Sequence, residues 1–178
     1  MALKRRKGLK RTPLKRRTTK QKKVRKLKPF YKPPDWFTKI KLGSHGNNPY
    51  QKRYWRVVSC LVRQRDEQYG CVSCPTKYKK WSDYDAAHFK RYAVCNSYFK
   101  FDPLNIAASC KACNRNDDGV VGHAFGEELK RRYGNDHLVW IEEENKHYKG
   151  KKMENHEIVT RVEQLLKDNQ WFDITTTH

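Results

Sequence analysis

The chain has 178 residues and a formal net charge of +21, from 40 Lys and Arg against 19 Asp and Glu. Residues 1–32 carry sixteen of these basic residues and no acidic one, whereas the rest of the chain carries 24 basic against 19 acidic residues. The composition therefore indicates a basic arm attached to a nearly balanced body. It excludes a membrane-spanning protein, because no stretch approaches about 20 apolar residues.

Residues 1–32 are predicted to be a disordered arm that binds nucleic acid. Their few apolar residues cannot form a core, and their like charges repel one another. No apolar stretch follows the charges, so a signal peptide is not expected. The alternatives are a membrane-surface segment, which would need an amphipathic period that is missing, a localisation signal or a solubility tail. The residues expected to contact phosphates are Lys4, Arg5, Arg6, Lys7, Arg16, Arg17, Lys22 and Lys23.

A linker and a helix are predicted next. Residues 33–49 are rich in Pro, Gly and Asn, which favours a linker. From 50 to 68, Tyr54, Val58 and Leu61 recur at helical spacing, with charges on the opposite face. Cys60 is expected to be a small buried apolar residue in this helix. The histidines expected at the surface, without a role, are His45, His137, His147, His156 and His178.

The rest of the chain is predicted to complete an α+β fold. We expect short strands at 84–90 and 97–101, and a helix after residue 113 that residues 119–122 interrupt and 124–133 resume. Further helices are predicted at 137–147 and 154–169, the last with Ile158 and Val162 on one face. The predicted organisation is a core over 50–123 and a C-terminal helical region over 124–178 that packs on it.

Four of the six cysteines form two pairs with metal-site spacing, Cys71-x-x-Cys74 and Cys110-x-x-Cys113. Four thiolates around Zn²⁺ make a closed structural site, which would join the two ends of the loop between the pairs. A redox-active pair is the alternative, and the presence of two matched pairs weakens it. Structural zinc is the prediction.

Polar residues around these pairs are the candidates for chemistry. Asp85 and His88 lie between the pairs, Asn105 precedes the second pair, and Asn114 follows it directly. Asp118 is four residues past Asn114 and would share its face if one helix ran that far. Each has a plainer interpretation: His88 as a core histidine, Asn114 as a helix cap, and the aspartates as solvated side chains. His123, in a Gly-flanked segment, is a weaker candidate for phosphate or metal contact.

The order of these motifs resembles a known family. A histidine between two CxxC pairs and an asparagine on each side of the second pair are similar to the HNH, or ββα-metal, nucleases. The segments CVSCPTKYKKWSDYDAAHF, FKFDPLNIAASCKACN and ELKRRYGNDHLVWIEEENKH resemble more narrowly the phage NinG (Rap) recombination proteins, over about residues 50–168. The arrangement is also similar to phage endonuclease VII, a junction resolvase with zinc knuckles.

The resemblance implies roles for individual residues. His88 would be the general base that activates water, Asn114 a ligand of a catalytic Mg²⁺ or Mn²⁺, and Asn105 a positioning group for the loop that orients the histidine. Many relatives have Asp or His directly before the base, where this chain has Ala87. Asp85, on the same side of a strand as position 87, and Asp118 are therefore the competing second ligands.

The implied function is metal-dependent hydrolysis of branched recombination DNA, such as Holliday junctions or D-loops. The setting would be the cytoplasm of a bacterial host, with a phage-encoded protein. Lys90, Arg91 and Lys100 flank the predicted site and are expected to contact DNA, with a solvated face as the alternative. Cutting both strands of a junction would favour a homodimer. The rival functions are a non-catalytic zinc-knuckle binding protein and a sequence-specific HNH nuclease of the homing or restriction type.

Overall fold

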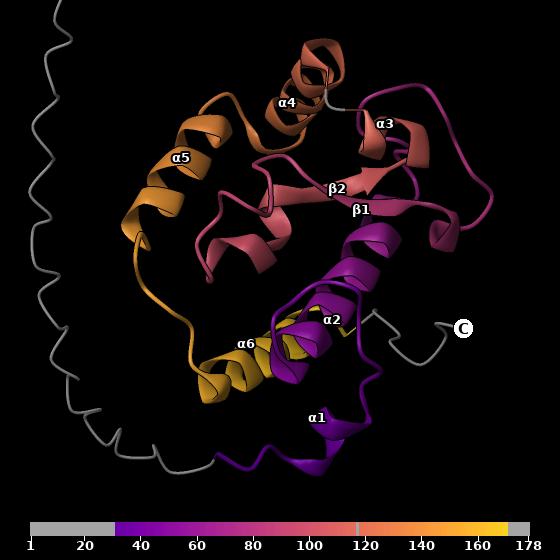
Figure 1. Ribbon diagram of the computed structural model, residues 1–178. Helices are drawn as coiled ribbons and strands as arrows, with labels where there is room; N and C mark the ends of the chain where they lie inside the picture. Colours follow the sequence, from indigo (N-terminus) through magenta and orange to yellow (C-terminus); the bar gives the residue numbers. More distant parts are fainter. Residues whose placement is uncertain (1–30, 117, 171–178) are drawn as a thin grey trace, which may run out of the picture. The chain divides into compact units, whose positions relative to one another are not determined.

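The protein is helix-rich with one small two-stranded sheet, in a computed structural model that describes residues 31–116 and 118–170 (Figure 1). The predicted basic arm lies almost wholly outside the described residues, as do residues 171–178. In chain order the elements are α1 (Asp35–Lys39), α2 (Pro49–Asp66), η1 (Trp81–Asp83), β1 (Asp85–His88), η2 (Phe99–Phe101), η3 (Pro103–Asn105), β2 (Ile106–Ser109), α3 (Lys111–Arg115), α4 (Gly119–Tyr133), α5 (His137–His147) and α6 (Asn155–Asp168), where η denotes a 3₁₀ helix.

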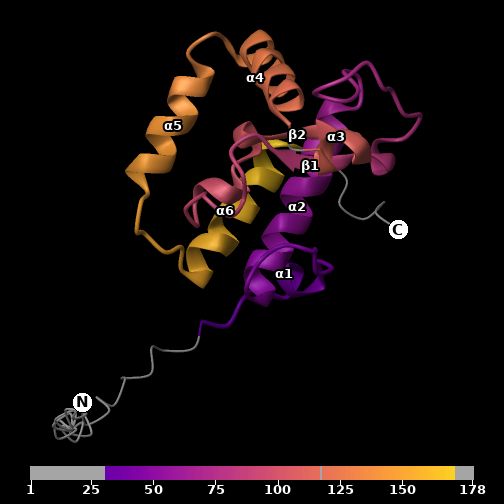
Figure 2. The same ribbon diagram turned by 45° about the horizontal axis from the view of Figure 1, so that its top comes forward.

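Helix α2 is the centre of the larger apolar core and confirms the helix predicted at 50–68. It begins where the Asn48 side chain accepts a hydrogen bond from the Gln51 backbone N–H at 2.9 Å, with Pro49 in the first turn. Its apolar face packs against α6, which runs beside it in both views (Figures 1 and 2). Cys60 is fully buried on this face, as expected.

Strands β1 and β2 pair antiparallel, with Asp85 opposite Ser109 and His88 opposite Ile106. The hairpin lies between two apolar layers. Ile106 joins the core around α2, and Ala87 and Ala107 join a second cluster with Phe125 of α4. Burial on both sides explains why all four residues of β2 are buried and why its first three, Ile106, Ala107 and Ala108, are apolar without alternation.

A buried carboxylate joins α2, β2 and α4. Asp66 is 1% exposed, and its Oδ2 accepts a hydrogen bond from the Ala108 backbone N–H at 2.9 Å. The Arg65 Nε lies 2.7 Å from Asp66 Oδ1, and an Arg132 guanidinium nitrogen lies 3.0 Å from Oδ2. The charge of Asp66 is therefore paired twice and also bonded to the strand, as buried charges require.

The strand predicted at 97–101 is wrong. The Asn96 side chain accepts hydrogen bonds from the backbone N–H groups of Tyr98 (2.9 Å) and Phe99 (2.8 Å), which turns the chain into the 3₁₀ helix η2. A local side-chain bond to the backbone here replaces the strand ladder. Phe99 and Phe101 are still buried, as anchors of the two clusters.

The helix predicted after residue 113 breaks earlier than expected. Helix α3 ends at Arg115, and a new helix, α4, begins after Asp118, whose side chain accepts a hydrogen bond from the Val121 N–H at 2.8 Å. An aspartate at this position caps a helix strongly, so residues 119–122 become the first turn of α4 and do not interrupt it. The helices predicted at 137–147 and 154–169 are confirmed by α5 and α6.

The segment 33–49, predicted as a linker, packs on the body of the protein. It contains α1, and Phe37 and Ile40 are buried in the core around α2. Its Pro and Gly content marks turns that pack on the body. Across 31–116 and 118–170, no helix has the length and apolarity needed to cross a membrane.

Candidate metal centre and active-site cleft

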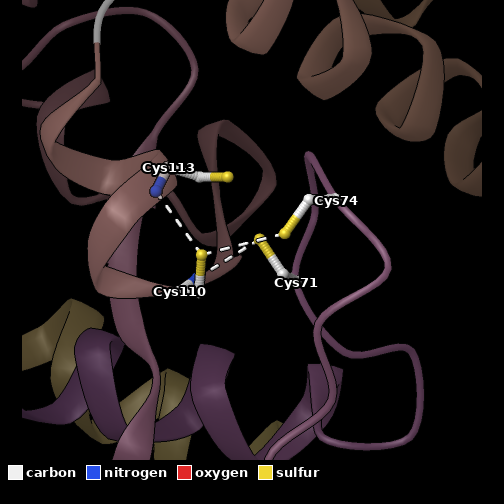
Figure 3. Close-up of side chains that lie close together, drawn as sticks. All are labelled: Cys71, Cys74, Cys110 and Cys113. Carbon is white, nitrogen blue, oxygen red and sulfur yellow. Dashed lines mark hydrogen bonds between the residues drawn. The ribbon is translucent and has the colours of Figure 1, made fainter.

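The two CxxC pairs meet near the end of the sheet where Asp85 pairs with Ser109 (Figure 3). Cys71 and Cys74 come from the loop after α2, and Cys110 and Cys113 come from the start of α3. Their four Sγ atoms lie within 4.8 Å of one another, and Cys74 Sγ is 3.8 Å from Cys110 Sγ. A tetrahedral Zn²⁺ with Zn–S bonds of about 2.3 Å requires sulfur–sulfur distances of about 3.8 Å. The cluster therefore has the donor set and spacing to hold a metal such as zinc.

Hydrogen bonds around the sulfurs also suit thiolates. The Cys110 N–H donates to Cys71 Sγ at 3.2 Å, and the Cys113 N–H donates to Cys110 Sγ at 3.4 Å. Burial raises the pKa of Cys74, but bonds with Thr76 and neighbouring thiols outweigh it and lower that pKa to about 7. Burial and the crowding of the other thiols raise the pKa of Cys113. A divalent cation among the sulfurs would relieve that crowding, because it stabilises thiolates.

The turn that presents Cys113 also places Asn114. Helix α3 starts at the second pair, and Asn114 N–H bonds back to the Cys110 carbonyl at 2.9 Å. From there the Asn114 Nδ2 donates to Asp85 Oδ2 at 3.1 Å, across to the first residue of β1. The structure thus brings together Asn114 and Asp85, two of the predicted ligands of a catalytic ion.

A cleft of about 380 Å³ opens beside this pair. The side chains that line it and carry charge, a polar group or an aromatic ring include His45, Trp55, Arg56, Arg63, Asp85 and Asn114. A smaller cavity of about 110 Å³ is lined by residues that include His88 and Asn114. Two of the three predicted catalytic residues therefore line one cavity, and Asn114 also lines the larger cleft.

His88 is held by its ring and by one nitrogen. The ring stacks on Trp55 with centroids 5.0 Å apart and planes at 13°. Its Nε2 lies 2.8 Å from the Lys100 carbonyl oxygen, which only accepts, so Nε2 carries the proton and Nδ1 keeps its lone pair. Burial lowers the pKa of His88 to about 4, against an opposing effect of that hydrogen bond. His88 is therefore neutral near pH 7, and its Nδ1 keeps a lone pair that can accept a proton.

Asn105 is fully buried and fastens the chain that follows His88. Its Oδ1 accepts from the Lys90 N–H at 2.9 Å, its Nδ2 donates to the Lys90 carbonyl at 3.2 Å, and its backbone carbonyl accepts from Phe89 N–H. The side chain is not at the cleft. Asn105 thus fixes the backbone at Lys90, two residues after His88.

Neither Ala87 nor Asp118 is placed to be the second ligand of a catalytic ion beside Asn114. Ala87 is 6% exposed and packs in the apolar cluster with Val72 and Phe125, so position 87 cannot hold an ion. Asp118 does not share a helix with Asn114, because α3 ends before it. Its carboxylate instead caps α4 and accepts from Asn116 Nδ2 at 2.7 Å. Asp85 is the carboxylate that the fold places next to Asn114.

The predicted DNA-contacting cations have different surroundings. Lys90 forms an ion pair with Glu142, so its charge is already matched. Lys100 Nζ lies 4.3 Å from the centroid of the Tyr92 ring, in a cation–π contact. Arg91 is exposed and lines the smaller cavity. The eight arm residues, Lys4 to Lys23, lie outside the described residues.

One histidine expected at the surface is buried: His137 is 7% exposed, and its Nε2 lies 3.0 Å from the Leu104 carbonyl. His45 is exposed, as expected, but its ring packs against Trp55 with centroids 4.6 Å apart and lies 6.4 Å from the His88 ring. No sequence signal joins His45 to residues 43 positions away. His123 is exposed on α4.

Comparisons with known proteins agree on one family. Residues 1–171 match the family model described as Bacteriophage Lambda NinG protein. The chain is 28% identical over 122 residues to Protein ninG of Escherichia phage 933W, and 27% identical to Protein ninG of Escherichia phage lambda. Each match covers 66% of this chain and 59% or 58% of the relative, so the chain spans less than two thirds of the relatives' length. No solved structure matches the chain significantly. The chain belongs to the NinG family.

Proposed function

We propose that this protein is a metal-dependent DNA endonuclease of the HNH type, which hydrolyses phosphodiesters in branched recombination intermediates. The observation that carries the proposal is the contact between Asp85 and Asn114 at the wall of a cleft that Arg56 also lines. Anionic and amide oxygens are the donors that Mg²⁺ and Mn²⁺ prefer, and arginines suit a phosphate. Family membership and the net charge of +21 are consistent with a nucleic-acid substrate.

Asp85 and Asn114 would hold the catalytic ion. Rotation of the Asn114 amide by 180° exchanges its Nδ2 for Oδ1, so that both side chains turn oxygen toward one cation. When bound, such an ion supplies positive charge that stabilises the phosphorane-like transition state. Zinc at the four cysteines has a separate task, because it fixes the turn from which Asn114 projects.

His88 would act as the general base. Its Nε2–H is bonded to the Lys100 carbonyl, which fixes the tautomer and leaves the Nδ1 lone pair to take a proton from water. The pKa of about 4 keeps the ring neutral at physiological pH, so the basic form is fully populated. Asn105 would keep this geometry by holding the backbone at Lys90.

Branched DNA is the substrate class that fits the distribution of charge. The arm's contacts would be with phosphates, which carry little sequence information. An enzyme that binds mainly phosphates responds to the shape of DNA more than to its bases. The proposed setting is a bacterial host cell. A dimer would supply two active sites for cutting the two strands of a junction.

The test is cleavage of a labelled four-way junction beside a linear duplex, during Mg²⁺ and Mn²⁺ titrations. We expect wild type to cut the junction, His88→Ala to lose at least about 100-fold in rate, and Asp85→Ala and Asn114→Ala to need more metal. His147→Ala, an exposed histidine on α5, is the matched control and should cleave normally. Zinc content should be unchanged in His88→Ala.

Two results would decide against the proposal. Tight, salt-sensitive binding with no metal-dependent cleavage by wild type would favour a zinc-knuckle binding protein, which the apolar setting of Ala87 already makes the second candidate. A single cut site on linear duplex, with junctions ignored, would favour a sequence-specific nuclease.

A further inference from the structure

The loop that carries His45 is held in a fixed path against α2. The Gly43 N–H donates to the Lys52 carbonyl at 3.0 Å, and a Cβ at Gly43 would come within 2.8 Å of that oxygen. Gly46 has φ of +121°, a conformation that residues with a Cβ rarely adopt. The backbone conformation at Gly43 and Gly46 therefore fixes the loop that places the His45 ring in the cleft.

His45 occupies the cleft beside the general base proposed above. Its ring lies 4.6 Å from Trp55, 5.3 Å from Tyr92 and 6.4 Å from His88, measured between centroids. Its Nδ1 lies 2.8 Å from Ser44 Oγ, which orients the ring and leaves Nε2 as the nitrogen available to a ligand. The cleft wall it forms is shared with Asp85 and Asn114.

The two imidazoles have different environments. His88 is stacked on Trp55 and bonded through Nε2 to a carbonyl, so only Nδ1 can exchange a proton. His45 keeps an exposed edge, where Nε2 can exchange protons with solvent between turnovers. Partial burial lowers the pKa of His45, and a bound phosphodiester anion would act in the opposite direction because it favours the imidazolium.

His45 does not complete a metal site with the neighbouring groups. In the described part of the chain, the four cysteines form the one cluster of three or more His, Cys, Asp or Glu whose donor atoms are within 4.8 Å of one another. His45, His88 and Asp85 therefore do not converge on a common ion. Instead, the 6.4 Å between the rings of His45 and His88 would let His88 act on the attacking water while His45 acts on the leaving oxygen.

We propose that His45 is the acid that protonates the leaving oxygen of the cleaved phosphodiester, an inference that rests on the proposed nuclease function. Water attacks phosphorus and a new P–O bond forms, while the proton of that water passes to His88 Nδ1. The bond from phosphorus to the bridging oxygen breaks, and its electron pair stays on that oxygen. The oxygen then takes the proton held by His45 Nε2, which returns the imidazole to its neutral form.

A bridging sulfur substitution tests this role, because a thiolate has a pKa near 8.5 and leaves without a proton. Junctions are made with sulfur in place of the 3′ bridging oxygen at the scissile position, and separately in place of the 5′ oxygen. With normal junctions, His45→Gln should cleave about 100-fold more slowly than wild type. With sulfur at the oxygen that leaves, His45→Gln should cleave within about threefold of wild type, whereas His88→Ala should remain slow on every substrate.

Controls separate this role from binding and folding. His147→Gln, an exposed histidine, should match wild type on all substrates. Junction affinity in Ca²⁺ and the Mn²⁺ concentration at half-maximal rate should be unchanged in His45→Gln. A loss that sulfur does not relieve, a higher Mn²⁺ requirement or no loss at all would each overturn the assignment while wild-type cleavage stands. No cleavage by wild type would overturn the nuclease function and this inference with it.

Discussion

The four-cysteine cluster and the imidazole pair, His45 and His88, flank the same hairpin but are built in different ways. The cluster comes from two local CxxC turns, and its geometry is the one that a tetrahedral ion imposes. The imidazole pair is assembled from two segments, 43 positions apart, by ring packing on Trp55. One half of the site therefore has the geometry of a metal centre, and the other depends on the apolar core.

This difference indicates two separable supports for the proposed reaction. Asn114 follows Cys113 directly, so its position depends on the metal centre. His88 stacks on a residue of α2, and the core around α2 contains none of the four cysteines. Perturbing one half should leave much of the other intact, and the predictions below test that separation.

The largest effect is expected from losing a zinc ligand. Cys110→Ser should remove the metal, because four-thiolate sites bind structural zinc with about 10–16 kcal/mol of apparent free energy. Metal analysis should fall from one zinc per chain to none, and the hairpin and α3 should lose protection from hydrogen exchange. The centre of α2 should stay protected.

The matched control is Cys60→Ala, which removes a thiol from the α2 core. It should lower stability but keep one zinc per chain. Retention of zinc by Cys110→Ser would contradict the four-ligand site, and loss of α2 protection would contradict the separation of the two halves.

The next effect concerns Asp66, which connects both halves through β2. Asp66→Ala leaves Arg65 and Arg132 without their shared carboxylate and the Ala108 N–H without an acceptor. Breaking a buried pair in this way costs about 3–5 kcal/mol. Urea unfolding should show this loss, and Asp83→Ala, at an exposed position, should change stability by less than about 0.5 kcal/mol. Equal losses in both variants would rule out a special role of the network.

A smaller effect is expected from pH, and it belongs to the imidazole half. The folded pKa of His88, about 4, lies below the ordinary histidine pKa of 6.5, so between those values the unfolded chain binds more protons. The stability from neutral His88 is complete above pH 6.5 and is lost as pH falls toward 4. The slope is at most about 1.4 kcal/mol per pH unit.

His88→Gln cannot take up this proton and should flatten the dependence over that window, while His147→Gln should not. The measurement is the unfolding free energy of each variant at several pH values between 4 and 7. An unchanged slope in His88→Gln would mean that other groups cause the acid sensitivity.

The smallest effect on the folded body is expected from the arm. Replacing Lys4, Arg5, Arg6 and Lys7 by Gln should leave the melting temperature unchanged. It should reduce the slope of log affinity against log salt by up to about 3.6, or 0.9 for each lost phosphate contact. Lys146→Gln, on α5, supplies a single-charge control. An unchanged slope would mean that these four arm residues do not contact DNA phosphates.

Regular local patterns were predictable. The helical spacing in 50–68 and 154–169 and the paired cysteines each depend on residues close in sequence, and the structure has α2, α6 and the cysteine cluster there. The two wrong predictions of secondary structure arose where a side chain bonds to the nearby backbone. Asn96 turned a predicted strand into η2, and Asp118 began α4 before the glycines could interrupt a helix.

The amino-acid sequence by itself determined the basic arm, the metal-binding spacing and the family, because these follow from composition and from motifs in order. Tertiary structure alone decided that Asp85, not Ala87 or Asp118, meets Asn114, and that the His45 ring lies 6.4 Å from the His88 ring. The physical reason is that these contacts cross 29 and 43 positions of chain. They are fixed by strand register, ring packing and the tight loop at Gly43, none of which has a local signature.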